Sequence, residues 1–276
     1  NPAPGEIGIA HTRWATHGAP TAKNAHPHAT EHVALVHNGI IENFKELRAE
    51  LRDAGRTLES DTDSEVVAHL VSRLVETGHS PQEAVADVLP RLRGAFALAI
   101  AFRDDPDILI GARRGSPLVV GYGVNETYIG SDALALAPLT QEISYLEEGD
   151  WVVVTRDCAS IYDAENTAVT REIRNSGASA AAVEKGNYRH FMQKEIFEQP
   201  TVVAQTLGSY LRQSDNSVAL PQFDFDISRI KRITIVACGT SYYAGMVAKY
   251  WFEQFARVPV DIDVASEFRY REPVLE

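Results

Sequence analysis

The first ninety residues alternate between short apolar runs and amphipathic stretches. Residues 6–10 and 32–37 are apolar runs typical of buried strands. Residues 43–52 have the pattern of a helix, and 60–78 follow with apolar residues at helical spacing, opened by a Ser-Asp-Thr-Asp sequence. Residues 80–83 (Ser-Pro-Gln-Glu) are a capping box with proline at the first helical position, which predicts a third helix.

From residue 94 the pattern changes to short β-prone runs separated by Gly, Asp, Asn and Pro. These runs cover residues 95–102, 107–112, 118–121, 127–129, 151–155 and 160–162. Their spacing is typical of an antiparallel meander of hairpins. Helices followed by successive hairpins favour an α+β domain in which helices cover sheets.

A second domain is predicted after a polar, Ala- and Ser-rich stretch at 164–186, which we interpret as a linker. Residues 187–212 look helical, and 233–237 form a continuous apolar run typical of a parallel strand buried on both faces. A helix over 242–255 and a strand over 258–264 would complete one βαβ unit, the first step of a doubly wound sheet. The predicted domains are therefore 1–163 and 187–276.

Composition narrows the class of protein. The chain has 276 residues, of which 45% are hydrophobic and 23% charged, as in ordinary globular proteins. Its formal net charge of −12 argues against nucleic-acid binding, and no apolar run is long enough to cross a membrane. The two cysteines have no partners at metal-ligand spacing, so we expect no metal, no cofactor and a reducing, cytoplasmic location.

Residues 11–18 place two His, an Arg and a Trp directly after the first apolar run. Arg13 offers a planar fork suited to a carboxylate. The alternative is a structural network, with Trp14 in the core and Arg13 paired to an acidic side chain. The sequence leaves both interpretations open.

Asn38-Gly39 follows the second apolar run. Asn-Gly is the commonest hairpin signal, and the hairpin turn is therefore the preferred interpretation. A side-chain amide beside a glycine N–H can also form an oxyanion hole. Asp63 is most simply a helix cap or first-turn acid. Held near Arg13, it would let the pair bind a zwitterionic amino acid.

Residues 238–241 (Cys-Gly-Thr-Ser) lie between an apolar strand and a helix. A tight turn with glycine and two hydroxyls at a helix N-terminus favours an anion, usually phosphate. The pattern is not a nucleotide-binding loop. Cys238 is interpreted as a small turn residue rather than a nucleophile.

Several segments resemble one family in order and spacing. They are HTRWATHG, NAHPH, VHNGIIENF, SDTDSE, GSPLV, MQKEIFEQP, VACGTSYYAGM and ASEFRYR. The chain resembles the glucosamine-6-phosphate synthases, the isomerising glutamine–fructose-6-phosphate aminotransferases, from about residue 7 to its end. The segments HTRWATHG and HNG alone would also suit the wider class II glutamine amidotransferases. The CGTS segment narrows the resemblance to the glucosamine-6-phosphate synthases.

The resemblance implies a fold, an activity and partners. It implies an N-terminal-nucleophile-hydrolase-like four-layer αββα domain, followed by the start of an α/β doubly wound phosphosugar-isomerase (SIS) domain. Family members take ammonia from glutamine and convert fructose-6-phosphate to glucosamine-6-phosphate, a step of amino-sugar biosynthesis. The substrates would be glutamine and fructose-6-phosphate, and the full-length protein would be a homodimer.

The resemblance also assigns roles to residues of this chain. Glutamine would be contacted by Arg13, Trp14, Thr16, His17 and Asp63, the oxyanion by Asn38 and Gly39, and the sugar phosphate by Thr240 and Ser241. Arg13 and Asp63 would hold the backbone groups of glutamine. Trp14 would lie on a loop that closes over it and gates ammonia passage.

The chain departs from the family at its ends. The family nucleophile is an N-terminal cysteine, whereas this chain begins with Asn1, and neither Cys158 nor Cys238 lies at a matching position. We therefore expect a fragment, truncated at both ends, that lacks the nucleophile strand and both half-reactions. The alternatives are a non-catalytic sugar-phosphate sensor, for which an oxyanion hole has no use, and another class II amidotransferase, such as the phosphoribosyl-diphosphate enzyme.

Overall fold

The computed structural model describes residues 5–13, 17–177, 185–212, 217–219, 223 and 225–274. The chain divides into two compact units, Asn1–Phe191 and Met192–Glu276. We refer to them as the first and the second unit.

The first unit contains two antiparallel sheets with helices. Its helices are α1 (Phe44–Asp53), α2 (Ser64–Glu76), α3 (Pro81–Val88) and α4 (Ala133–Leu136), with 3-10 turns at Ala22–Asn24 and Leu89–Arg91. Its strands are β1 (His28–Ala29), β2 (Val33–Ile41), β3 (Gly94–Phe102), β4 (Leu109–Arg114), β5 (Val119–Tyr122), β6 (Thr127–Gly130), β7 (Glu142–Tyr145), β8 (Trp151–Val154), β9 (Ala159–Tyr162), β10 (Ala168–Val169) and β11 (Arg174–Asn175). The larger sheet has the order β1-β2-β3-β4-β8-β9-β10, and the smaller has the order β11-β7-β5-β6.

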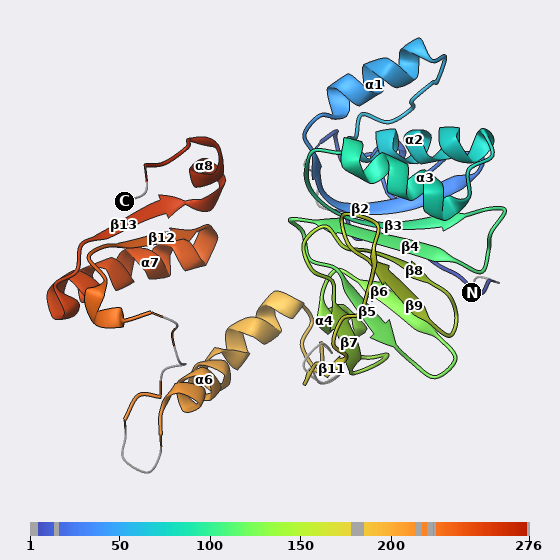
Figure 1. Ribbon diagram of the computed structural model, residues 1–276. Helices are drawn as coiled ribbons and strands as arrows, with labels where there is room; N and C mark the ends of the chain where they lie inside the picture. The colour runs from blue at the N-terminus through green and yellow to red at the C-terminus, as the bar shows by residue number, and fades with distance from the viewer. Residues whose placement is uncertain are drawn as a thin grey trace. The chain divides into compact units, whose positions relative to one another are not determined.

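These elements form four layers. Figure 1 shows α1, α2 and α3 on one side of the larger sheet, and the smaller sheet with α4 on the other side. Side chains of β3 alternate between the two faces of the larger sheet. Leu98 and Ile100 belong to the core under the helices, whereas Ala97 belongs to the core between the sheets. The predicted αββα architecture is confirmed.

The sequence signals for helices between residues 43 and 88 agree with the structure. The capping box at Ser80 is formed in full, because its hydroxyl accepts from the Glu83 N–H and the Glu83 carboxylate accepts from the Ser80 N–H. Helices α1 and α2 also lie close to their predicted ranges. The prediction of these three helices is therefore confirmed.

Three predictions about the first unit were wrong. Residues 6–10 form no strand, since no described strand pairs with them and Ile7 is 36% exposed. The hairpins do not form one meander, because β5, β6 and β7 belong to the smaller sheet, whereas β4 pairs with β8 in the larger one. The stretch 164–186 is not all linker, since β10 pairs with β9 and β11 pairs with β7.

The second unit contains the predicted βαβ unit. Its elements are α6 (Phe191–Tyr210), a 3-10 turn at Ile227–Arg229, β12 (Ile233–Ala237), α7 (Gly239–Trp251), a π-helical turn at Phe252–Ala256, β13 (Val260–Val264) and α8 (Ala265–Tyr270). Strands β12 and β13 are parallel, with Ile235 opposite Ile262.

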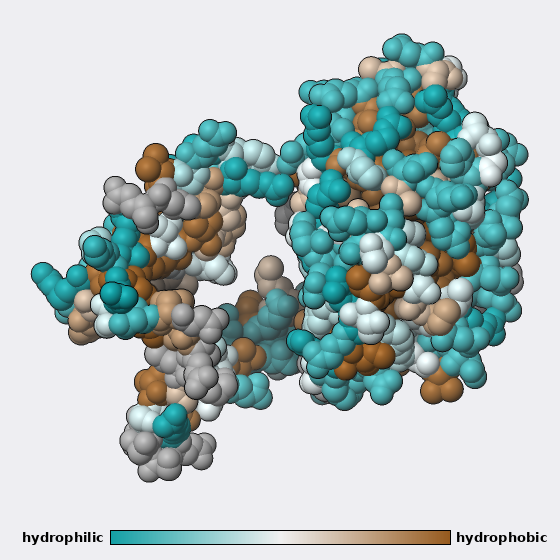
Figure 2. All heavy atoms as spheres, viewed as in Figure 1, coloured by the Kyte–Doolittle hydropathy of each residue, from teal (hydrophilic) through white to brown (hydrophobic). Residues whose placement is uncertain are grey.

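Burial in the second unit differs from the prediction. Residues of β12 alternate between half-buried and exposed, because among the described residues it pairs only with β13. Figure 2 shows hydrophobic side chains on the surface of the second unit. Val247 and Trp251 of α7 are 51% and 61% exposed. The prediction of a strand buried on both faces is wrong for this structure.

No helix formed by the described residues is both long enough and apolar enough to span a bilayer.

Candidate functional site

A cavity of about 710 Å³ lies in the first unit, at the ends of several elements. Strands β2 and β3 form one wall, β6 and α4 another, and the loops before β1 and α2 close it. The lining residues fall mainly in 10–13, 36–40, 62–64, 97–99 and 129–131. Of the residues predicted for glutamine, the cavity brings together Arg13, His17, Asn38, Gly39 and Asp63.

Asn38 and Gly39 do not form a hairpin turn. Both lie inside β2, where Asn38 is opposite Ala97 and Gly39 opposite Phe96 of β3. Gly39 has a φ of +139°, and a Cβ there would lie 2.1 Å from the carbonyl oxygen of Ala95. Only glycine fits this close approach. The hairpin interpretation is therefore wrong, and the pair lies on the wall of the cavity.

Asp63 occupies the N-cap position of α2, but its side chain makes no capping bond. The carboxylate instead accepts a hydrogen bond of 2.8 Å from the N–H of Ile41, at the end of β2. His17 Nδ1 lies 3.8 Å from one carboxylate oxygen, and His37 Nδ1 lies 3.9 Å from the other. Asp63 is 3% exposed. A buried carboxylate with unused acceptor capacity is suited to an ammonium group.

Arg13 folds back onto its own loop. Its guanidinium donates to the carbonyl oxygens of His17, Gly18 and Ala19 at 2.5, 2.9 and 3.1 Å. The structural interpretation expected a pair with an acidic side chain, but among the described residues the guanidinium bonds to backbone carbonyls instead. It orders the loop and lines the cavity together with Asp63.

A histidine pair that also lines the cavity was not predicted as part of the site. The Ser64 hydroxyl lies 2.9 Å from His37 Nδ1 and 3.2 Å from His26 Nε2, so it bridges the two rings. Burial lowers the pKa of His37 to about 4. Burial, with a smaller contribution from His11, lowers the pKa of His26 to about 3. Both rings are thus neutral at pH 7, so this part of the cavity is polar but uncharged.

A sequence signal for this pair existed. His37 ends an apolar run, and His26 lies in the NAHPH segment. The sequence gives no sign that Ser64 joins the two rings, because Ser64 lies at the start of α2, 27 residues after His37.

The remaining predicted residues lie elsewhere. Trp14 and Thr16 lie outside the described residues. Thr240 and Ser241 occupy the first turn of α7 in the second unit, directly after Gly239 with its φ of +58°. They are exposed at the N-terminus of that helix.

Neither cysteine lines the cavity. Both Cys158 and Cys238 are free and exposed. Cys158 lies in the turn between β8 and β9, where its sulfur is 3.1 Å from the Thr155 hydroxyl. Cys238 is the N-cap residue of α7, in agreement with its interpretation as a turn residue.

Two family models match the chain. A glutamine amidotransferase domain matches residues 11–138, and a SIS domain matches residues 226–275. The first range contains every predicted glutamine residue, and the second contains Thr240 and Ser241.

Curated relatives match along the whole chain. The chain is 69% identical to the isomerizing glutamine–fructose-6-phosphate aminotransferase of Zymomonas mobilis, over 100% of this chain and 46% of the relative. It is 61% identical to the protein of that name from Bradyrhizobium diazoefficiens, over 99% of this chain and 45% of the relative. The chain thus spans a little less than half the length of these relatives.

A solved structure is also similar. It is a glutamine phosphoribosylpyrophosphate amidotransferase from B. subtilis in complex with ADP and GMP, 19% identical, with a TM-score of 0.49, covering 91% of this chain and 50% of that one. The family matches and the curated relatives agree along the sequence: the chain contains a glutamine amidotransferase domain and the start of a SIS domain, and it is similar over its whole length to isomerizing glutamine–fructose-6-phosphate aminotransferases.

Proposed function

We propose that this chain is part of an enzyme that converts fructose-6-phosphate and glutamine to glucosamine-6-phosphate and glutamate. The first unit would release ammonia from glutamine, and the second would contribute to the site that accepts it. The observation that carries the proposal is the cavity of the first unit, where a guanidinium, a buried carboxylate and an amide next to a strained glycine line one space.

The cavity supplies the two charges that free glutamine requires. Arg13 would bind the α-carboxylate, and Asp63 the α-ammonium group. Asp63 is already fixed to β2 by its bond to Ile41, so it can accept from the substrate with its second oxygen. His17 lies beside that oxygen and would border the bound substrate.

Catalysis requires stabilisation of the negative oxygen that develops when the amide is attacked. The Asn38 side chain and the Gly39 N–H would donate to it. Since both lie in a nine-residue strand paired along its length with β3, the Gly39 N–H and the backbone that carries the Asn38 side chain are in position before substrate arrives. Such preorganised donors lower the barrier without reorganisation during the reaction.

Several further roles rest on the family alone. Trp14 and Thr16 would complete the glutamine pocket, and Thr240 and Ser241 would bind part of the sugar phosphate at the N-terminus of α7. We also propose a homodimer in the cytoplasm for the full-length protein.

The test is the Asn38→Ala variant of the full-length protein. Loss of one oxyanion donor reduces kcat with glutamine about 100- to 1000-fold. The glutamine KM should change much less, and the thermal midpoint should fall little. A variant with near-normal kcat and a lowered midpoint would make Asn38 a structural strand residue and would contradict the proposal.

A further inference from the structure

Two loops that carry glutamine-binding residues meet at the cavity from distant parts of the sequence. We call them the Arg13 loop (residues 11–13 and 17–19) and the Asp63 loop (residues 59–63). The guanidinium of Arg13 bonds to carbonyls of its own loop. The distance between the two charges that would bind glutamine therefore depends on whatever joins the loops.

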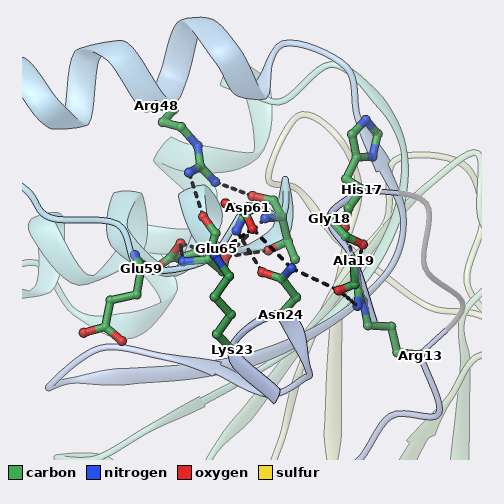
Figure 3. A network of polar contacts seen from close by, with 12 residues as sticks. Arg13, His17, Gly18, Ala19, Lys23, Asn24, Arg48, Glu59, Asp61 and Glu65 are labelled. Atoms are coloured by element: carbon green, nitrogen blue, oxygen red, sulfur yellow. Dashed lines mark hydrogen bonds and ion pairs between the residues drawn. The ribbon is translucent and has the colours of Figure 1, made fainter. Parts of the chain in front are cut away.

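Asn24 joins them. Its side chain is completely buried, in a 3-10 turn. Its Nδ2 donates to the carbonyl oxygen of Ala19 at 3.0 Å and to a carboxylate oxygen of Asp61 at 3.4 Å, and its Oδ1 accepts from the N–H of Asp61 at 2.9 Å. Figure 3 shows the Asn24 amide between Ala19 of one loop and Asp61 of the other.

The contact reaches Arg13 itself. The carbonyl oxygen of Ala19 accepts from Asn24 and also from Arg13 Nη1, at 3.1 Å. One acceptor thus connects the amide to the guanidinium (Figure 3). A shift of Asn24 would move the group that orients Arg13.

The packing around Asn24 is close at Gly18. Gly18 has a φ of +76°, and a Cβ there would lie 2.7 Å from Asn24 Nδ2 and 3.2 Å from the Cβ of Asp61. The two loops are therefore in close contact at this point, and glycine is required for it.

The Asp63 loop is braced from its other side. Arg48 of α1 donates to the carbonyl oxygens of Ser60 and Thr62 at 2.7 and 2.5 Å (Figure 3). Glu65 of α2 accepts from the Ser60 N–H at 2.8 Å. This loop is thus fixed to two helices, and Asn24 transfers its position to the Arg13 loop.

We propose that Asn24 is a positioning residue that sets the spacing between Arg13 and Asp63, and thereby the affinity for glutamine. It lies outside the lining of the cavity and acts through the two loops. The proposal rests on the proposed function and assigns a residue that controls the use of glutamine without contacting it.

The test compares variants of the full-length protein. Asn24→Ala removes all three hydrogen bonds. Asn24→Asp has the same shape and keeps the acceptor for the Asp61 N–H, but it loses the donor to Ala19 and to the Asp61 carboxylate, and it places a second carboxylate beside Asp61. The matched control is Asn43→Ala, because Asn43 also bridges two backbone groups, donating to the Arg91 carbonyl at 2.9 Å and accepting from the Arg93 N–H at 3.0 Å.

Loss of two hydrogen bonds in Asn24→Asp, or of three in Asn24→Ala, should raise the glutamine KM about tenfold in both variants. The kcat at saturating glutamine should stay within about twofold, as should the KM for fructose-6-phosphate. Asn43→Ala should lower the thermal midpoint by a similar amount and leave the glutamine KM unchanged.

Two results would overturn the proposal. One is an unchanged glutamine KM in Asn24→Asp, which decides the question even if Asn24→Ala fails to fold. The other is an equal rise of the KM in Asn43→Ala, which would assign the effect to general loss of stability. A wild-type protein that does not consume glutamine would overturn both this proposal and the proposed function, and is identified before any variant is compared.

Discussion

The two units of the chain use the same kinds of element but bury them to different degrees. In the first unit, helices and two sheets enclose side chains such as Leu98, which is 1% exposed. In the second unit, Val260 is the one hydrophobic side chain among the described residues that is fully buried, whereas Val247 of α7 and Phe255 of the turn after it are 51% and 76% exposed. A two-stranded sheet that contacts α7 and the short α8 has too little apolar surface to enclose a core.

This difference determines how well each candidate site is defined. Asn38 and Gly39 lie in a strand that β3 pairs along its full length, so the described residues alone fix their geometry. Thr240 and Ser241 begin a helix that packs on a strand pair. The position of a binding group is only as fixed as the elements that hold it. The proposed glutamine site is therefore fixed by paired strands of the first unit, whereas the proposed phosphate site is fixed by the first turn of α7.

Two glycines with positive φ give the sharpest comparison. Gly39→Ala would force a Cβ to 2.1 Å from a backbone oxygen of β3 at a φ of +139°, which should cost at least about 3 kcal/mol of unfolding free energy. Gly239 has a φ of +58°, and a Cβ added there would meet no atom within 4 Å, so Gly239→Ala should cost about 1–2 kcal/mol. Urea denaturation of both variants measures these costs.

The comparison depends on Gly39→Ala losing more unfolding free energy than Gly239→Ala. Similar losses in both variants would mean that β2 and β3 can separate without cost around residue 39. In that case the described packing would not fix the geometry of Asn38 and Gly39.

The pH dependence of stability should also separate the units, because all nine histidines lie in the first unit. The native pKa of His37 is about 4, lowered from 6.5 by burial. Between these values the unfolded chain binds a proton that the native state does not. The native state is therefore not penalised by His37 above pH 6.5. As pH falls from 6.5 toward 4, protonation of His37 in the unfolded chain lowers the unfolding free energy by about 3 kcal/mol at most.

Urea denaturation of the first unit between pH 7 and pH 4 tests this expectation. His37→Gln should show a clearly smaller loss over the same range, since it removes the group that takes up the proton. An unchanged pH dependence in this variant would contradict the assignment of the effect to His37.

Local sequence signals predicted those elements whose formation depends on nearby residues. The capping box at Ser80 and the hairpin strands are examples, since neighbours in sequence supply their contacts. The strand expected over residues 6–10 failed because a strand depends on a partner. The split into two sheets depends on long-range pairing, such as that of β4 with β8, which periodicity does not encode.

The candidate site shows the same limit. Residue types and the family resemblance identified Arg13 and Asp63, but not their contacts. Local rules suggested a turn at Asn38-Gly39 and a helix cap at Asp63, whereas tertiary structure put the first pair inside β2 and directed the Asp63 carboxylate to Ile41. The roles of Asn24 and Ser64 are set by contacts 37 and 27 residues away in sequence.

The central claim is that the first unit uses glutamine while the second uses the sugar phosphate. The most direct measurement is the KM for each substrate in the full-length Asp63→Asn and Ser241→Ala variants. Asp63→Asn keeps an oxygen for Ile41 but removes the charge, and should raise the glutamine KM about tenfold or more and leave that of fructose-6-phosphate unchanged. Ser241→Ala should do the reverse. If Asp63→Asn leaves the glutamine KM unaltered, or if both variants raise both constants equally, the assignment of the two substrates to the two units is contradicted.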